Sequence, residues 1–173
     1  MEASLTYSPL KIFTDGGCSG NPGPGGWAYI IVQETFQGHT LLAEEFGGEK
    51  ATTNNRMELI AVINSLQTLK NRNASERNAS VPRKAVVYTD SQYVQKGITE
   101  WIHKWKQNSW RTSDKKSVKN QDLWVELEAI SGELTLQGVT LNWEWVRGHS
   151  GIEYNERCDR MTQQAIASVQ KNA

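Results

Sequence analysis

The sequence of 173 residues has only two cysteines, Cys18 and Cys158, and neither belongs to a Cys-x-x-Cys pair. Two such cysteines do not make a disulfide scaffold, and a reducing, cytoplasmic setting fits best. No apolar run approaches the roughly 20 residues needed to span a bilayer, so we expect no membrane segment. Residues 1–9 also lack the basic region and apolar core of a secretory signal.

An excess of charge is also lacking, because 19 Lys and Arg balance 19 Asp and Glu. Zero net charge argues weakly against a nucleic-acid-binding domain, since such domains are often basic. The bases are nevertheless concentrated between residues 101 and 119, where six of them face a single acid, Asp114. Four tryptophans lie among these bases or just beyond them: Trp101, Trp105, Trp110 and Trp124. This mixture favours a surface that follows a nucleic-acid backbone, and the alternative is a solvated helix with core tryptophans.

The length fits one domain, and we expect an N-terminal extension over residues 1–9 and a single domain over 10–170. The apolar patterns predict strands at 10–14, 26–32, 40–46, 85–88 and 139–146, and helices at 55–69, 122–134 and 153–169. The polar stretch 70–83 is typical of a surface loop. This mixture of strands and amphipathic helices predicts an α/β fold.

Asp90 marks the point where a strand gives way to a helix. The run 85–88 is apolar and rich in β-branched residues, and apolar side chains recur at helical spacing after Tyr93. In α/β sheets, ligands bind beyond the carboxyl ends of the strands. A carboxylate at that place is either a cap for the next helix or a site residue, and the local pattern leaves both interpretations open.

Three further acids stand in comparable places. Asp15 ends a strand candidate and precedes a turn cluster at 16–26 that is dense in glycine and proline. Glu58 shares a helix face with apolar side chains and so points toward the sheet, although it also forms a potential capping box with Asn55. Asp159 lies at the edge of the apolar stripe of the last helix.

Clustered carboxylates favour hard ions such as Mg²⁺ or Mn²⁺ over zinc. Packing so much negative charge together would be costly without a cation. Two such ions about 4 Å apart can activate water and stabilise the leaving oxygen of a phosphodiester. The spacing permits the four acids to converge but does not show it. His149, flanked by glycines in the 147–151 loop, is by its own pattern more typical of a surface or capping histidine.

Several longer motifs resemble those of type 1 ribonucleases H of the bacterial type with a basic protrusion. They follow the family order from about residue 10 to 165: Thr14-Asp15-Gly16-Gly17-Cys18, Asn21-Pro22-Gly23-Pro24-Gly25-Gly26, Thr52-Thr53-Asn54-Asn55-Arg56-Met57-Glu58-Leu59, Thr89-Asp90-Ser91-Gln92-Tyr93-Val94, Gly97-Ile98, Trp101-Ile102, Lys119-Asn120, Asp122-Leu123-Trp124, Trp143-Glu144-Trp145-Val146, Gly148-His149 and Asn155-Glu156-Arg157-Cys158-Asp159. The resemblance implies a ribonuclease H-like α/β fold, with a mixed five-stranded β-sheet flanked by α-helices.

The resemblance also implies an activity, namely endonucleolytic hydrolysis of the RNA strand of RNA–DNA hybrids that leaves 5′-phosphate and 3′-hydroxyl ends. Four carboxylates would hold two Mg²⁺ ions, with Mn²⁺ as a substitute and no small-molecule cofactor: Asp15, Glu58, Asp90 and Asp159. His149 would assist proton transfer or product release, and Glu156 would support the second ion. The expected partner is the hybrid duplex alone, bound by a cytoplasmic monomer that contacts no membrane.

Hybrid recognition requires groups that sense the 2′-hydroxyl from the minor groove. The resemblance assigns RNA contacts to five positions: Cys18, Asn21, Asn54, Asn55 and Gln92. It assigns a DNA phosphate to Thr53 with Asn21, DNA sugars to Trp101 and Trp124, and a basic protrusion to the segment with Lys104, Lys106, Lys119 and Asn120. Phosphate, sugar and shape carry no base code, so this binding should be independent of sequence.

Two other classes of function compete with this interpretation. One is a catalytically silent hybrid-binding module that uses the basic, tryptophan-rich segment alone, although the presence of all four acids and His149 opposes it. The other is an integrase-like DNA strand-transfer enzyme on the same fold. The paired Asn54 and Asn55 disfavour that second alternative, because in the family they belong to hybrid recognition.

Overall fold

The computed structural model describes residues 8–75 and 83–172. The chain forms five strands and several helices in the following order: β1 (Leu10–Cys18), β2 (Gly23–Thr35), β3 (Gly38–Thr52), α1 (Asn54–Ser75), β4 (Arg83–Thr89), α2 (Gln92–Lys96), η1 (Gly97–Trp101), α3 (Ile102–Gln107), α4 (Gln121–Leu136), β5 (Val139–Trp145) and α5 (Glu153–Lys171). Most of the predicted N-terminal extension lies outside the described residues, as does the 76–82 part of the predicted loop.

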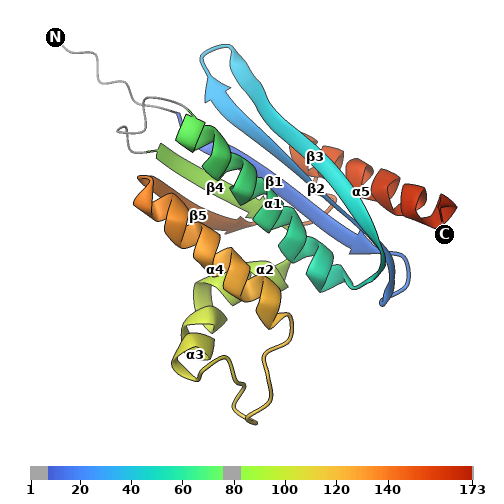
Figure 1. Ribbon diagram of the computed structural model, residues 1–173. Coiled ribbons are helices and arrows are strands. Elements are labelled where there is room, and N and C mark those ends of the chain that lie inside the picture. The colour runs from blue at the N-terminus through green and yellow to red at the C-terminus, as the bar shows by residue number, and fades with distance from the viewer. Residues whose placement is uncertain (1–7, 76–82, 173) are drawn as a thin grey trace.

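The strands form one mixed sheet in the order β3-β2-β1-β4-β5 (Figure 1). Strands β1, β2 and β3 pair antiparallel, while β4 lies parallel to both β1 and β5. The central strands are apolar and β-branched, as strands covered on both faces must be. This arrangement confirms the predicted five-stranded fold.

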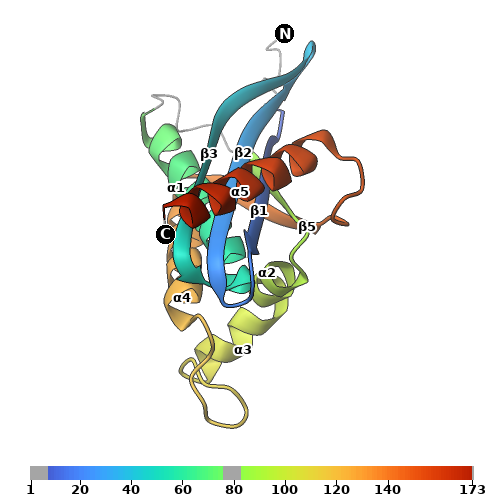
Figure 2. The same cartoon turned by 90° about the vertical axis from the view of Figure 1, so that its right-hand side faces the viewer.

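Helices cover both faces of the sheet, with α1 and α4 on one face and α5 on the other (Figure 2). The larger core lies between the sheet and α1, α4 and the α2–α3 segment, and it includes Leu66, Trp124 and Leu127. A smaller core beneath α5 contains Phe13 and Cys158. Packing on both faces holds β1 and β4 in place, so Asp15 within β1 and Asp90 directly after β4 have defined positions.

Several predicted boundaries differ from the structure. Strand β1 continues through Asp15 to Cys18, because the glycines that follow still pair with β2. Residues 70–75 belong to α1 rather than to a surface loop, and the helix is retained there by the buried Leu69 and Asn73. Strand β3 runs from 38 to 52, well beyond the predicted 40–46. Among the described residues, no helix is both long and apolar enough to cross a membrane.

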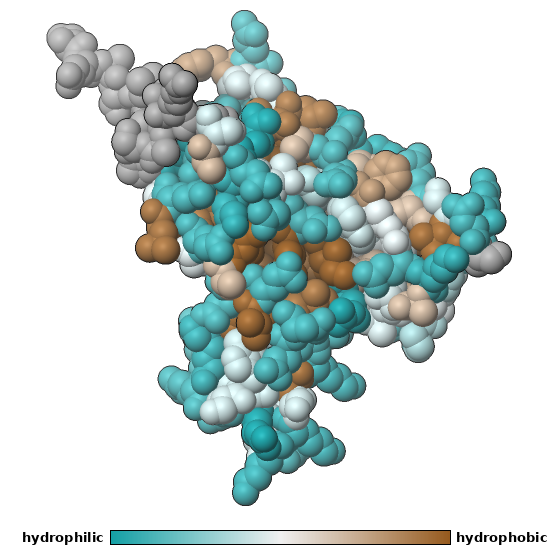
Figure 3. Space-filling view, viewed as in Figure 1, coloured by the Kyte–Doolittle hydropathy of each residue, from teal (hydrophilic) through white to brown (hydrophobic). Residues whose placement is uncertain are grey.

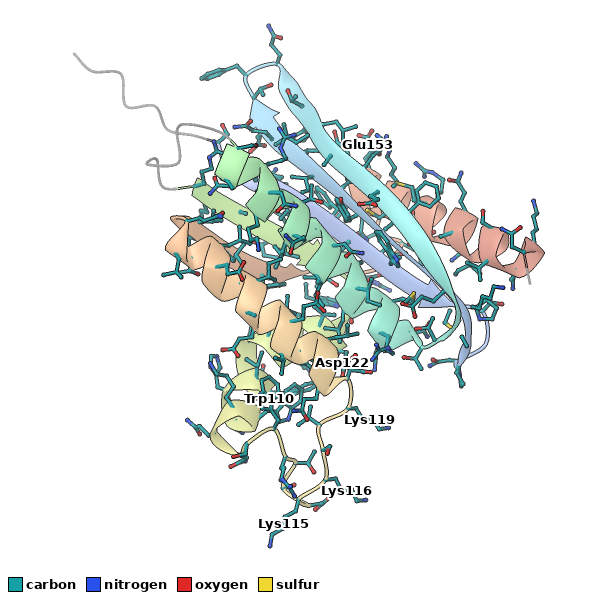
Figure 4. The ribbon with its side chains drawn as sticks, viewed as in Figure 1. Trp110, Lys115, Lys116, Lys119, Asp122 and Glu153 are labelled. Atoms are coloured by element: carbon teal, nitrogen blue, oxygen red, sulfur yellow. The ribbon has the colours of Figure 1, made fainter. Side chains whose placement is uncertain are left out.

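The surface on the α1 and α4 side is largely hydrophilic, with apolar atoms exposed in places over the middle of the molecule (Figure 3). A projection below the sheet consists of α3 and the irregular segment 108–120 that leads to α4. Lys115 and Lys116 point away from the fold at the tip of this segment (Figure 4). The segment expected to form a basic protrusion therefore projects from the fold.

Candidate active site

Asp15 lies inside β1, where it is paired with Ala28 of β2. Burial raises the pKa of its carboxyl group to about 6, and a hydrogen bond from the Thr162 side chain partly offsets this effect. The nearby charges of Asp90 and Asp159 raise the pKa further. Asp15 is therefore a carboxylate that the fold holds among like charges.

Glu58 lies in α1 and is buried beneath the same part of the sheet. It does not cap the helix: the Thr53 hydroxyl accepts the Arg56 backbone N–H at 3.4 Å, so the alternative of a capping box with Asn55 is excluded. The close approach of α1 to β1 depends on Gly16, because a Cβ at that position would overlap the Glu58 backbone. Burial, followed by the charges of Asp15 and Asp90, raises the pKa of Glu58 well above its usual range.

Asp90 follows the last residue of β4 and precedes α2. Ser91 is the N-cap of α2, since its hydroxyl accepts the Val94 backbone N–H at 3.2 Å. The alternative in which Asp90 caps the helix is therefore excluded. Burial raises the pKa of the Asp90 carboxyl group, and the charge of Asp159 adds to this effect.

These three acids converge. Asp15, Glu58 and Asp90 each offer one carboxylate oxygen, and the three oxygens all lie within 4.8 Å of one another. Asp159 belongs to an adjoining group with His149 and Glu156, whose ligand atoms also lie within 4.8 Å of one another. The two groups are electrostatically linked, because Asp159 and His149 both act on the pKa of Asp15 and of Asp90.

The donor set fits a hard divalent cation. Glu58 Oε2 is buried, and no hydrogen-bond partner for it lies among the described residues. An uncompensated buried carboxylate oxygen costs several kcal/mol in a protein interior unless a charge offsets it. Asp15 and Asp90 add two more oxygens at the same place, which is the ligand type preferred by Mg²⁺ and Mn²⁺.

His149 stands in the loop between β5 and α5 in the left-handed backbone region, with φ 54°. Its side chain is 78% exposed, and Nδ1 lies 4.0 Å from Glu156 Oε2. Glu156 also accepts the Gly151 backbone N–H at 3.3 Å through Oε1. Glu156 of α5 thus contacts the loop at both His149 and Gly151, close to Asp159.

The residues expected to contact RNA lie around the start of α1. The Asn21 side chain accepts the Asn54 backbone N–H at 3.2 Å, so the β1–β2 turn and the helix start are held together. The Cys18 thiol, at the end of β1, contacts the carbonyl oxygen of Thr52 at 3.3 Å. Asn54 and Asn55 are exposed there, Thr53 is half-buried, and Gln92 is exposed at the start of α2.

The tryptophans form a packed cluster, and Trp124 lies inside it. Trp101 and Trp105 are half-buried, whereas Trp124 is fully buried and donates its indole N–H to the Tyr93 hydroxyl at 3.0 Å. No part of the Trp124 ring is accessible in this structure, and its contact with DNA sugars stays a prediction. Trp101 stacks edge-on against Tyr93 and remains available.

The basic side chains of the projection differ in how free they are. Lys104 and Lys119 are exposed, and Lys106 forms an ion pair with Glu128 of α4. Asn120 forms two side-chain hydrogen bonds within the protein. Its amide nitrogen donates to the Tyr93 hydroxyl at 3.2 Å, and its amide oxygen accepts from the Arg56 guanidinium at 3.4 Å. Asn120 thus connects elements of the fold in this structure.

Comparison with known proteins identifies the family. A family model described as RNase H matches residues 8–167 of the chain. A ribonuclease H of Nitrosomonas eutropha is 52% identical over 169 residues, which cover 98% of this chain and 96% of the relative. A ribonuclease H of Treponema denticola is 49% identical over 166 residues, covering 94% and 98%. The chain belongs to the RNase H family.

Solved structures of RNase H proteins share the fold. LC9-RNase H1, described as a type 1 RNase H with the type 2 active-site motif, superposes with a TM-score of 0.74 at 28% identity and covers 96% of this chain and 75% of that one. LC11-RNase H1, solved in complex with an RNA/DNA hybrid, gives a TM-score of 0.68 at 24% identity, covering 93% and 99%. These solved structures confirm the predicted fold.

Some residues at this RNase H site escaped sequence reasoning. Thr162 of α5 touches Asp15, and Trp145 of β5 donates its indole N–H to the Asp90 carbonyl oxygen at 2.9 Å. Arg56 joins α1 to Asp122 at the start of α4. Trp145 and Arg56 did stand in the recognised motifs, but contact between distant segments has no signature in local periodicity.

Proposed function

We propose that this protein is an endoribonuclease that hydrolyses the RNA strand of RNA–DNA hybrids, with divalent metal ions held by Asp15, Glu58, Asp90 and Asp159. Membership of the RNase H family carries the class of enzyme. The observation that carries the site is the convergence of three carboxylate oxygens around the buried, unpartnered Glu58 Oε2. A silent binding module would have no reason to keep this costly cluster.

Mg²⁺ is the proposed ion, with Mn²⁺ as a substitute, and two ions bind when the substrate is present. When bound, such ions activate a water nucleophile and stabilise the leaving oxygen, which gives 5′-phosphate and 3′-hydroxyl ends. Asp15, Glu58 and Asp90 are the residues that would hold the first ion. Asp159, with Glu156 and His149 beside it, would support the second ion. His149, whose side chain is 78% exposed, would assist proton transfer or product release.

The hybrid lies across the edge where β1, the start of α1 and the start of α2 meet. RNA contacts come from Cys18, Asn21, Asn54, Asn55 and Gln92. The Asn21–Asn54 hydrogen bond supports this assignment because it unites the two segments that would read the sugar edge. Thr53, with its hydroxyl at the helix N-terminus, and the neighbouring Asn21 bind a DNA phosphate.

The DNA strand runs toward the projection, where Trp101 packs against its sugars and Lys104 and Lys119 offer positive charge. Lys106 and Asn120 are less available to the DNA strand in this proposal, because Lys106 is paired with Glu128 and Asn120 is hydrogen-bonded to Tyr93. The resulting contacts are with phosphate and sugar, so cleavage is independent of sequence and weakens at high salt. The enzyme acts as a cytoplasmic monomer.

A pair of substitutions tests this function. Asp15→Asn and Asp90→Asn keep side-chain size but remove the charge that binds the cation. We expect both variants to bind a labelled hybrid within threefold of the unmodified protein in a metal-free filter assay. We expect both to lose cleavage by about a thousandfold or more, the scale of a lost catalytic group. Undiminished cleavage by both variants would contradict the proposed metal site. Absence of any cleavage by the unmodified protein would favour a silent binding module.

A further inference from the structure

Trp145 makes a contact with Asp90 that the proposed mechanism does not use. Its indole N–H donates to the backbone carbonyl oxygen of Asp90 at 2.9 Å. Trp145 is the last residue of β5 and is aligned with Thr89, the last residue of β4. The side chain is 44% exposed, so core packing does not explain why a tryptophan stands there.

The backbone around Asp90 belongs to neither β4 nor α2, and a few hydrogen bonds from side chains and the adjacent strand hold it. The Thr89 hydroxyl accepts the Ser91 backbone N–H at 3.1 Å. The Val146 backbone N–H donates to the Thr89 carbonyl oxygen at 2.9 Å, which extends the β4–β5 register by one bond. The Trp145 indole then fixes the next carbonyl, that of Asp90 itself. The direction of the Asp90 carboxylate therefore depends on β5.

The segment after β5 also lies close beside the carboxylate. A Cβ built on Gly148 would lie 2.8 Å from Asp90 Oδ2, closer than real Cβ atoms come, so a larger residue there would have to displace the carboxylate or the loop. His149 follows immediately, with its backbone in the left-handed region. One short segment thus meets Asp90 at two points, with Trp145 at the carbonyl and Gly148 at the carboxylate.

We propose that Trp145 is a positioning residue: its indole hydrogen bond, together with the close approach of Gly148, sets the Asp90 carboxylate toward Asp15 and Glu58. The same contact fixes the base of the His149 loop over the site. This inference rests on the proposed function, because it concerns the same carboxylate cluster. It adds two residues that bind neither metal nor hybrid but decide how well Asp90 can bind a cation.

The substitution that isolates the bond is Trp145→Phe, which removes the N–H and keeps most of the apolar ring. A hydrogen bond contributes about 1 kcal/mol, and 1.36 kcal/mol corresponds to a tenfold change. We therefore expect kcat for hybrid cleavage to fall about fivefold to tenfold, with KM for the hybrid within twofold. We expect the Mn²⁺ dissociation constant of the free protein, measured by calorimetry, to rise about threefold to tenfold. The matched control is Trp143→Phe, two residues earlier in the same strand and half-buried, which should change neither quantity.

Gly148→Ala is a second variant that tests the same proposal, and it provides the answer if Trp145→Phe fails to fold. Its added methyl group must displace the Asp90 carboxylate or the loop, so it should weaken Mn²⁺ binding in the same direction. If Trp145→Phe folds and matches the unmodified protein in both kcat and Mn²⁺ affinity, or if Gly148→Ala retains full Mn²⁺ affinity, the inference is overturned. Because the calorimetric measurement needs no substrate, it remains decisive even if the unmodified protein cleaves no hybrid, a result that would contradict the proposed function instead.

Discussion

Arg56 and Asp122 form a two-bond ion pair, with Nη1 3.1 Å from Oδ1 and Nη2 2.9 Å from Oδ2. The pair joins the first turn of α1, two residues before Glu58, to the first turn of α4. Arg56 also reaches Asn120, and Asn120 reaches the Tyr93 hydroxyl, which accepts the Trp124 indole N–H. The carboxylate cluster and the tryptophan cluster are thus mechanically connected through polar contacts.

We predict that Arg56→Met lowers the free energy of unfolding by about 1 kcal/mol. The side chains of Arg56 and Asp122 are 32% and 63% exposed, so solvent screens the pair and the two-bond geometry keeps it at the upper end for surface pairs. Urea unfolding of Arg56→Met, Asp122→Asn and the double variant measures the coupling. Additive effects of the two substitutions would show that the pair contributes nothing.

The coupling should also depend on pH. Arg56 lowers the pKa of Asp122 below its ordinary value, so the pair stabilises the fold above pH ~4. As the pH falls through the lowered pKa, Asp122 becomes protonated in the folded state and the stabilisation disappears. The coupling energy of the same double-variant cycle should therefore be present near neutral pH and diminish as the pH falls below ~4.

We predict that Asp15→Asn stabilises the metal-free protein near neutral pH. The folded state raises the pKa of Asp15 from 3.8 to about 6, so it binds more protons than the unfolded state between these values. Stability from this group is greatest below pH ~4 and falls as the pH rises through about 6. Removing the charge should add on the order of 2 kcal/mol at pH 7.5 in EDTA, given about 1.4 kcal/mol per pKa unit.

Thermal unfolding with and without EDTA measures this gain. Asp114→Asn is the control, because that acid lies exposed on the projection and should give no comparable change. The gain for Asp15→Asn should shrink toward zero as the buffer approaches pH 4. A variant that is less stable than the unmodified protein at pH 7.5 would show that burial and the neighbouring charges do not destabilise the Asp15 carboxylate.

We predict that Mg²⁺ stabilises the folded protein and that this effect requires Glu58. An ion that binds only the folded state adds about 1.4 kcal/mol at ten times its dissociation constant. Glu58→Gln should abolish most of the shift in unfolding temperature, because Glu58 Oε2 has no other partner among the described residues. The shift should also diminish below pH ~6, where protons compete for the cluster. Equal Mg²⁺ shifts for Glu58→Gln and the unmodified protein would exclude Glu58 as a ligand.

We predict that substitution of Trp124 lowers mainly the stability of the fold, whereas substitution of Trp101 weakens mainly the binding of the hybrid. Trp124 is fully buried against Gly97, where a Cβ would overlap its ring, so Trp124→Ala should cost about 3–5 kcal/mol. Trp101→Ala, at a half-buried position, should cost less stability and raise KM for the hybrid several-fold. Urea unfolding and steady-state kinetics on both variants distinguish the two. A larger effect on KM than on stability for Trp124→Ala would support its predicted contact with the DNA sugars.

The sequence predicted the architecture well, because that information is local or carried by long motifs. Leu59, Val62 and Leu66 reveal the buried face of α1 through their spacing, and the run 85–88 reveals a central strand. The acids at strands and on an inward helix face identified candidates for the site. Their convergence was not predictable from spacing, because it depends on the pairing of β1 with β4 and on the approach of Glu58 to Gly16.

The errors have local physical causes. The glycines after Asp15 suggested a turn, yet they continue the β1–β2 ladder, and at Gly16 the approach of α1 leaves no room for a Cβ. The N-cap residues of α1 and α2 could not be chosen among neighbouring polar residues from the sequence. In the structure the caps are Thr53 and Ser91, rather than Glu58 or Asp90. Trp124 has the composition of a binding residue, but the Tyr93 hydroxyl satisfies its indole N–H in the interior.

The central claim is that the carboxylate cluster uses metal ions to cut the RNA strand of a hybrid. The most direct test incubates the protein with an RNA–DNA hybrid labelled separately on each strand, in Mg²⁺ or in EDTA, and resolves the products. We predict cleavage of the RNA strand alone, only with Mg²⁺, to fragments with 5′-phosphate and 3′-hydroxyl ends. Cleavage that persists in EDTA, or that cuts the DNA strand while sparing the RNA, would contradict the account.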